Sequence, residues 1–247
     1  MNRRSSVGFT IIETILFLGI SGALAAAILA GSSIAISQQR YRDAGSTLQA
    51  FFQRQYTNVS NVVNIRDNNW TCDAQANVIE IESSGLIAGA SECVIMGKLI
   101  RITDNGQTVV SSDVIGRQYA YETVTNDIDA LKQYRLAWTS VGQERKTVDW
   151  GASLARPASE GGSIESTALL VLRSPFSGVM RTFSPEGYTP GDAQYTIPAS
   201  VISSFNTKQT LCLNSPDFTV FQRLALVVQA RATGPTSIEL FGEGSGC

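Results

Sequence analysis

An unbroken apolar stretch is the first feature in the pattern of hydrophobic and polar positions along this chain. From Phe9 to Ile36 almost every residue is apolar or small, Glu13 is the one charged residue, and the next charge is Arg40. A helix of about 28 residues measures about 42 Å at about 1.5 Å per residue, more than the hydrocarbon thickness of a bilayer, about 30 Å. The stretch therefore predicts a helix that can cross a membrane.

The helical pattern continues beyond this stretch but becomes amphipathic. Apolar residues recur at three- and four-residue spacing, at Tyr41, Ala44, Leu48, Phe51, Phe52, Val59, Val62 and Val63. Polar residues such as Gln38, Arg42, Gln49 and Arg54 lie between them. This spacing places one apolar stripe along a helix. We expect the helix to run to about Ile65 and its outer half to pack by that stripe against a globular head.

From about Trp70 the pattern changes to short strand-like runs separated by turn residues. The expected strands span residues 78–82, 93–103, 107–110, 167–172, 178–183, 224–230 and 237–241. Asn105-Gly106 predicts a hairpin between the second and third of these runs, and the last four runs predict two further hairpins. The predicted fold class is α+β, a long N-terminal helix packed against a mostly antiparallel β-sheet head.

Two intervening segments carry other signals. Asp127 is expected to cap a short helix that runs through Tyr134. Residues 155–166 are rich in glycine, serine and proline and are expected to form an exposed loop. The three tryptophans, Trp70, Trp138 and Trp150, are expected to pack within the head.

Composition limits the chemistry that the chain can perform. The 247 residues carry a net charge of −2 and include no histidine. The lack of histidine excludes Ser-His-Asp and Cys-His catalysis and every histidine-ligated zinc site. No long basic stripe is present, so nucleic-acid binding has no electrostatic support.

Acidic residues offer no clear catalytic or metal-binding pattern. The pairs Asp127/Asp129 and Glu80/Glu82 are interpreted as caps or solvated faces rather than as a general acid and base. Asp104 begins a segment of calcium-loop composition that lacks the spacing of an EF-hand, so a turn is the better interpretation. We expect a protein that is not an enzyme and has no cofactor or metal.

The four cysteines, Cys72, Cys93, Cys212 and Cys247, form no C-x-x-C pair. Arg3 and Arg4 precede the apolar stretch, and the positive-inside tendency would hold them in the cytoplasm and leave the head outside. Disulfides are then expected, and four cysteines allow three connectivities. We favour the pairs nearest in sequence, Cys72 with Cys93 and Cys212 with Cys247.

The residues Gly8-Phe9-Thr10-Ile11-Ile12-Glu13, preceded by two arginines and followed by the apolar stretch, closely resemble the processing site of type IV prepilins and type II secretion pseudopilins. The resemblance implies that a prepilin peptidase cleaves after Gly8 and methylates the amine of Phe9. It also implies other pilin subunits, an inner-membrane assembly platform and the membrane itself as partners. Segments 91–101 and 237–239 loosely resemble heads of the secretion H type.

This resemblance divides the chain into four expected parts. They are a leader over residues 1–8, a transmembrane and filament-core helix over 9–36, an amphipathic extension over 37–66 and an extracytoplasmic head over 67–247. The chain departs from many type IV pilins, which carry a proline partway along the apolar helix, because its first proline is Pro157.

Glu13 is the residue that an ordinary anchor would not need. An ionisable residue within a membrane helix is a candidate functional site. After cleavage at Gly8, the amine of Phe9 on a neighbouring subunit can pair with this carboxylate. The expected function is a structural subunit of a type IV pilus-like filament, as a minor or tip pilin.

Alternatives to this function remain at this stage. One is a pseudopilin of a secretion system, and another is a plain membrane anchor. A third is a secreted binding protein or enzyme with an ordinary signal peptide, for which Ala23-Leu24-Ala25 or Ala25-Ala26-Ala27 would serve as the cleavage site.

Overall fold

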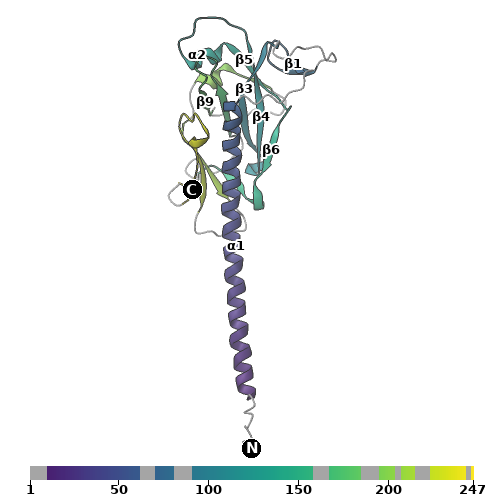
Figure 1. The fold of residues 1–247 in the computed structure, drawn as a ribbon, viewed down its shortest axis with the longest axis vertical. Helices are drawn as coiled ribbons and strands as arrows, with labels where there is room; N and C mark the ends of the chain where they lie inside the picture. Colours follow the sequence, from purple (N-terminus) through teal and green to yellow (C-terminus); the bar gives the residue numbers. More distant parts are fainter. Residues whose placement is uncertain are drawn as a thin grey trace, which may run out of the picture.

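The fold was described from a computed structural model, which covers residues 10–61, 70–80, 91–157, 167–184, 195–203, 207–214, 223–242 and 246–247. A long helix, α1 (Ile11–Asn61), carries a β-rich head around its C-terminal half, and its N-terminal half projects from the head (Figure 1). The fold class is α+β, as predicted. Residues 62–69, where the end of the helix was expected, lie outside the described residues.

The larger sheet has the strand order β10-β5-β4-β3-β8-β9, with β6 paired to the first half of β4, and every pairing is antiparallel. Its strands are β3 (Cys93–Thr103), β4 (Thr108–Gln118), β5 (Tyr134–Trp138), β6 (Glu144–Thr147), β8 (Ala168–Arg173), β9 (Met180–Phe183) and β10 (Thr196–Ile197). The two hairpins predicted here, β3–β4 and β8–β9, are confirmed.

A second antiparallel sheet has the order β13-β12-β11-β7. Its strands are β7 (Ser153–Ala155), β11 (Gln209–Asn214), β12 (Leu224–Val228) and β13 (Ile238–Phe241). The predicted hairpin of β12 and β13 is confirmed. A separate short hairpin consists of β1 (Trp70–Cys72) and β2 (Val78–Glu80), and residues 81–90 after it lie outside the described residues.

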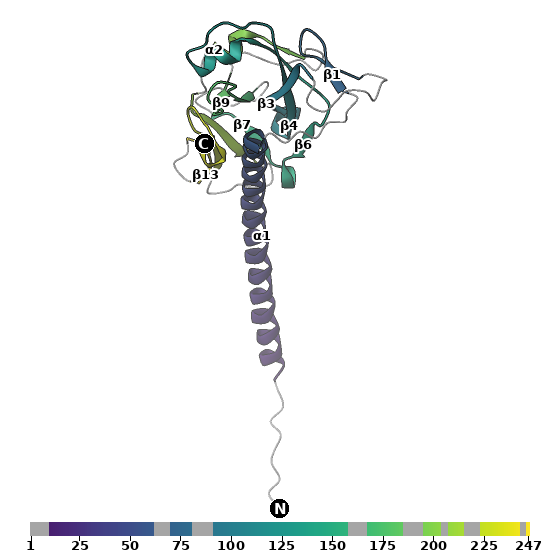
Figure 2. The same ribbon diagram turned by 45° about the horizontal axis from the view of Figure 1, so that its top comes forward.

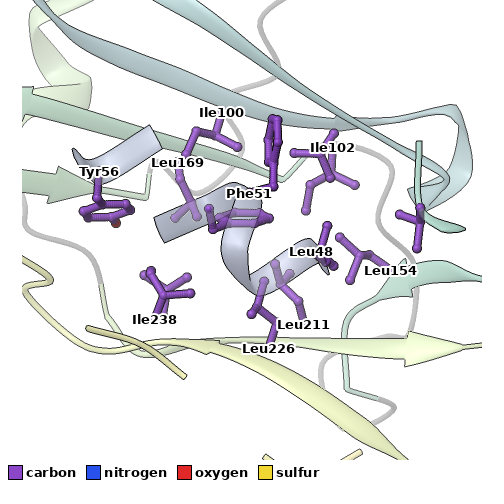
Figure 3. Close-up of a cluster of buried hydrophobic side chains, with 14 of the residues drawn as sticks. Leu48, Phe51, Tyr56, Ile100, Ile102, Leu154, Leu169, Leu211, Leu226 and Ile238 are labelled. Carbon is purple, nitrogen blue, oxygen red and sulfur yellow. The ribbon is translucent and has the colours of Figure 1, made fainter. Parts of the chain in front are cut away.

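The outer half of α1 lies between the two sheets rather than on one face of a single sheet (Figures 2 and 3). Leu48 and Phe51 of the helix belong to the same buried cluster as Ile100 of β3 and Leu226 of β12. The buried helix residues include most of the predicted stripe and also Gly45, Gln55 and Tyr56. The head is therefore built around the helix as its central layer.

The other face of the larger sheet is also buried. Leu99 and Leu170 point away from α1 into a second cluster with Leu131 of the short helix α2 (Asp127–Lys132) and Ile202 of the 3-10 helix η4 (Ala199–Ser203). Strands covered on both faces are expected to be apolar at consecutive positions. This explains the long run of β3, which the sequence shows without strict alternation.

Glycines permit two close approaches in this region. A β-bulge interrupts the β3–β4 pairing between Ile95 and Gly97, where a Cβ atom would lie 1.9 Å from the carbonyl oxygen of Val171. In the turn η1 (Asp104–Gly106), Gly106 has a φ of 85° and a Cβ atom there would lie 2.0 Å from the carbonyl oxygen of Leu154. The interpretation of this segment as a turn is confirmed.

Three sequence predictions about individual elements were wrong. Asn126, not Asp127, caps α2, because its side chain accepts a hydrogen bond from the backbone N–H of Asp129 at 2.9 Å. The helix ends at Lys132, and Tyr134 begins strand β5. Trp150 is 49% exposed rather than packed, whereas Trp138 is 3% exposed.

Candidate assembly site

The described part of the predicted processing site, from Thr10 to Glu13, lies at the free end of α1. Gly8 and Phe9 fall outside the described residues. Thr10 and Glu13 are described and form the first turn of the helix, far from the head (Figure 1). The candidate assembly site therefore comprises this first turn and the apolar half of α1 that follows it.

Glu13 and Thr10 cap the helix reciprocally. A carboxylate oxygen of Glu13 accepts hydrogen bonds from the backbone N–H of Thr10 at 2.8 Å and from its hydroxyl at 2.9 Å. The hydroxyl oxygen of Thr10 accepts one from the backbone N–H of Glu13 at 3.3 Å. This is the capping box, in which a threonine and an acid three residues later satisfy helix N–H groups. Glu13 thus has a local role that the sequence analysis missed, although the T-x-x-E spacing encodes it.

The apolar half of α1 packs against no other part of the chain that the structure describes. Its large side chains are exposed over most of their surface, at Ile11, Ile12, Ile15, Leu16, Phe17, Leu18, Ile20, Leu24, Ile28, Leu29, Ile34 and Ile36. Nothing approaches within 4 Å of the positions where Gly19, Gly22 and Gly31 would carry a Cβ atom. So large an apolar surface on a soluble protein marks an interaction site.

Among the described residues, α1 is the one helix long and apolar enough to cross a membrane. The half of α1 that carries the exposed apolar residues projects from the head (Figure 2). This surface needs either lipid or other helices around it.

Polar side chains fasten the outer half of α1 to the smaller sheet. The Tyr41 hydroxyl donates to the Leu213 carbonyl at 2.5 Å and accepts from the backbone N–H of Leu224 at 3.0 Å. The amide groups of Gln49 and Gln53 both donate to the Ile238 carbonyl, at 3.1 and 3.2 Å. These contacts hold the helix at the ends of strands β11, β12 and β13. The spacing of hydrophobic residues in the sequence does not predict such polar contacts.

Two fully buried polar residues fasten the helix to the larger sheet. Gln55 accepts a hydrogen bond from the Ser111 hydroxyl at 2.9 Å and donates to the Glu144 carboxylate at 2.9 Å. The Tyr56 hydroxyl lies 2.9 Å from that of Thr182 on β9. Burial strongly raises the pKa of Tyr56. A buried polar group without a partner is costly, so these pairs fix the position of the helix.

The cysteines are joined as Cys72–Cys93 and Cys212–Cys247, the pairs that were favoured from the sequence. The first bridge ties the β1–β2 hairpin to the start of β3. The second ties residues 246–247 to Cys212 of β11, the neighbour of Leu213, whose carbonyl accepts the hydrogen bond from Tyr41. Both bridges fasten segments at the periphery of the head.

The two acids of the pair Asp127/Asp129 bind different partners. Asp127 accepts hydrogen bonds from the Ser174 hydroxyl at 2.7 Å and from Nε of Arg181 at 2.8 Å. Burial by itself would raise its pKa, but hydrogen bonds from Ser177, Ser174 and Arg181 outweigh it and lower the pKa to about 2. Asp129 instead accepts from the amide of Asn126 at 2.6 Å. Glu82 lies outside the described residues.

In the part of the chain that the structure describes, no group of three or more Cys, Asp or Glu side chains is arranged to hold a metal ion. Comparison with known proteins adds no identification: no family model matches the chain, and no curated protein or solved structure is significantly similar to it.

Proposed function

We propose that the chain is a structural subunit of a type IV pilus-like filament, made as a single-pass membrane precursor and cleaved by a prepilin peptidase after Gly8. The proposal depends on one observation. The T-x-x-E cap formed by Thr10 and Glu13 stands directly after Gly8-Phe9, at the start of an apolar half-helix that the chain leaves uncovered.

The uncovered half-helix suits a subunit that exchanges lipid for other helices. Because lipid chains and leucine side chains are similarly apolar, transfer of the helix from a bilayer into a helical bundle changes little hydrophobic energy. Specific contacts must then set the register of the subunits. Glu13 supplies a charge at the helix start that the new amine of Phe9 on a neighbour can approach.

The continuity of α1 favours this function over ordinary secretion. The helix passes without interruption through Ala25, where a signal peptidase would cut. A chain that began at Ala26 would still expose Ile28 and Leu29, each 70% exposed, together with Ile34. A secreted soluble protein would gain nothing from such a surface.

The head supports a place for the subunit at the tip or as a minor component. It contains two sheets around the helix. Its end away from the emerging helix, where α2 lies (Figure 1), carries the exposed Tyr119, whose hydroxyl donates to the Lys132 carbonyl of α2 at 3.0 Å. Tyr121, two residues further along the chain, is also exposed. In a filament whose core is made of the apolar half-helices, the heads would face outward and be available for adhesion.

Mass spectrometry of the chain from sheared filaments tests the proposal. We expect a mature protein that begins at N-methylated Phe9, and we expect Gly8→Val to remain as an uncut membrane precursor. A mature chain that begins at Ala26 would overturn the proposal and establish ordinary secretion.

A further inference from the structure

The turn η2 (Asp149–Gly151) places an exposed tryptophan beside the helix where α1 leaves the head. The ring of Trp150 lies under the guanidinium of Arg40, 4.8 Å from ring centroid to Cζ. The indole N–H of Trp150 donates to a carboxylate oxygen of Asp43 at 3.4 Å. We call Arg40, Asp43 and Trp150 the collar.

The backbone of Trp150 is held in an unfavourable conformation. Its φ and ψ are 60° and 30°, in the left-handed region that glycine adopts easily and bulky residues avoid. The preceding residue, Asp149, is fixed by hydrogen bonds from the Thr47 hydroxyl at 2.8 Å and from Lys146 at 2.7 Å. Strain of this kind costs free energy and is concentrated at functional sites. Glycine would fit the turn better, so the indole itself requires an explanation.

The position of the collar along α1 explains why a tryptophan stands at position 150. Arg40 is four residues, about 6 Å, beyond Ile36, where the exposed apolar surface ends. From Ile11 to Arg40 the helix measures about 44 Å, close to the thickness of a bilayer with its headgroup layers, about 40–45 Å. A helix that spans the bilayer therefore carries the collar into the outer headgroup layer and leaves Glu13 near the inner one.

The chemistry of the collar matches that layer. Tryptophan is enriched where membranes meet water, because its ring is apolar and its N–H is polar. Arginine side chains at such depths bind lipid phosphates. Two further exposed arginines lie nearby, Arg42 on α1 and Arg223, which adjoins Leu224 at the Tyr41 contact.

We infer that the collar is a lipid-headgroup contact, which seats the head on the outer surface of an anionic bilayer and sets the depth of α1 before assembly. This inference rests on the membrane-resident precursor of the proposed function. It adds a second point of attachment, on the head itself, to the attachment that the apolar helix supplies.

Quenching of the tryptophan fluorescence of the full chain in vesicles of phosphatidylethanolamine and phosphatidylglycerol tests the headgroup contact. The chain has three tryptophans, and β1 and β5, which carry Trp70 and Trp138, lie at the end of the head away from the emerging helix (Figure 1). Lipids brominated near the headgroup end of the acyl chain should quench the Trp150 share of the emission. Lipids brominated near the methyl end should quench it less.

Three variants make the result specific. Trp150→Phe should abolish the bromine-quenched component. Trp150→Gly should also abolish it, while the head keeps or raises its unfolding temperature, because glycine accepts the backbone of the turn. Arg40→Gln should reduce quenching in anionic vesicles.

A Trp150→Phe chain that also carries Leu24→Trp separates the two proposals. Quenching of a tryptophan at position 24 by deeply brominated lipid reports insertion of α1 independently of the collar. If position 24 is quenched and Trp150 of the wild type is not, the collar contact is wrong while the membrane precursor stands. In another outcome, brominated lipids do not quench Trp150, and Trp150 is shielded from an aqueous quencher only when the chain self-associates. A second copy of the chain then occupies the collar, and the inference is overturned.

Discussion

The Tyr56 hydroxyl on α1 donates its hydrogen to the Thr182 hydroxyl on β9, at 2.9 Å. The direction follows from the Thr182 hydroxyl, which donates its single hydrogen to the Ala232 carbonyl at 2.8 Å and can only accept from Tyr56. The helix, the larger sheet and the segment before β13 are thus joined through one buried oxygen atom.

Removal of the Thr182 hydroxyl should lower the free energy of unfolding more than removal of the Tyr56 hydroxyl. Tyr56→Phe keeps the buried ring and the bond from Thr182 to Ala232, so we expect a loss of about 1 kcal/mol of unfolding free energy. Thr182→Val removes both hydrogen bonds and should cost about 2–3 kcal/mol. Urea unfolding of the full chain in mild detergent measures both, with Thr182→Ser as the control that keeps the hydroxyl. Equal losses for the two variants would show that the bond to Ala232 contributes nothing.

Gln55 should matter more than its exposed neighbour Arg54, although both contact Glu144. Gln55→Ala leaves the buried Ser111 hydroxyl without this acceptor and should cost about 1–3 kcal/mol. The side chain of Arg54 is 58% exposed, so loss of its ion pair with Glu144 should cost at most about 0.5 kcal/mol. If Ser111→Ala restores stability to Gln55→Ala, the penalty is the stranded hydroxyl. If Ser111→Ala does not restore stability, the loss in Gln55→Ala comes from lost packing instead.

Asp127 should contribute a pH-dependent part of the stability. Its pKa in the folded chain is about 2, below the ordinary value of 3.8. The contribution is therefore complete above about pH 4 and is lost as pH falls toward about 2, and it amounts to about 2 kcal/mol. Asp127→Asn should remove that part of the acid dependence and lower stability at neutral pH. Asp129→Asn, on the exposed side of the same helix, is the matched control for the exchange of a carboxylate for an amide.

Substitutions of Glu13 can separate its cap from its charge. Glutamine also serves as the acceptor of a capping box, so Glu13→Gln should keep the hydrogen bonds with Thr10 and lose the charge, whereas Glu13→Leu loses both. If the charge sets register between subunits, both variants should reach the membrane, be cleaved, and enter filaments poorly. Immunoblots of membrane and sheared-filament fractions give the answer. Normal incorporation of Glu13→Gln would leave the cap as the only role of this residue.

The Cys212–Cys247 bridge should protect the C-terminal segment. It spans 35 residues, and closure of a loop of that size is worth about 4 kcal/mol in the chain-entropy model. Cys247→Ser should release residues 246–247 from β11 and make that end sensitive to protease before the rest of the head. Cys72→Ser is the control, since it frees the distant β1–β2 hairpin. Identical cleavage patterns for the two variants would contradict this assignment of local roles.

Prediction from the sequence succeeded where burial follows simple periodicity. The three- and four-residue spacing that includes Tyr41, Leu48 and Phe52 corresponds to buried positions of α1. The apolar run from Cys93 to Thr103 matches β3 residue for residue, because both faces of that strand are covered. The three hairpins follow from turn residues between such runs.

Prediction failed where tertiary partners decide the structure. Strand β6 has the sequence Glu-Arg-Lys-Thr, and its pairing with β4 rather than an apolar face makes it a strand. Asp127 looks like a helix cap, yet Ser174 and Arg181 of distant segments bind it, and Asn126 takes the cap. Burial of Gln55 between Ser111 and Glu144 likewise depends on residues far away in the sequence.

For the candidate site, Glu13 and the apolar half-helix could be identified from the sequence, and the residues around Gly8 could be identified as a proposed processing motif. The spacing of Thr10 and Glu13 encodes the capping box, but the sequence analysis considered only the charge of Glu13. The collar could not be predicted, because its tryptophan and its arginine are 110 positions apart in the chain and meet only after the head folds. The exposure of Trp150 in a left-handed turn is visible only in the structure.

The location of α1 between two sheets also determines how the chain would carry mechanical load. A pull on the exposed half-helix acts along the helix axis, parallel to the surfaces that hold it. The contacts of Tyr41, Gln53 and Gln55 with opposite sheets are then sheared at the same time rather than peeled apart one after another. Withdrawal of the helix would empty the centre of the head, so α1 can be pulled out only at a force that unfolds the head as well.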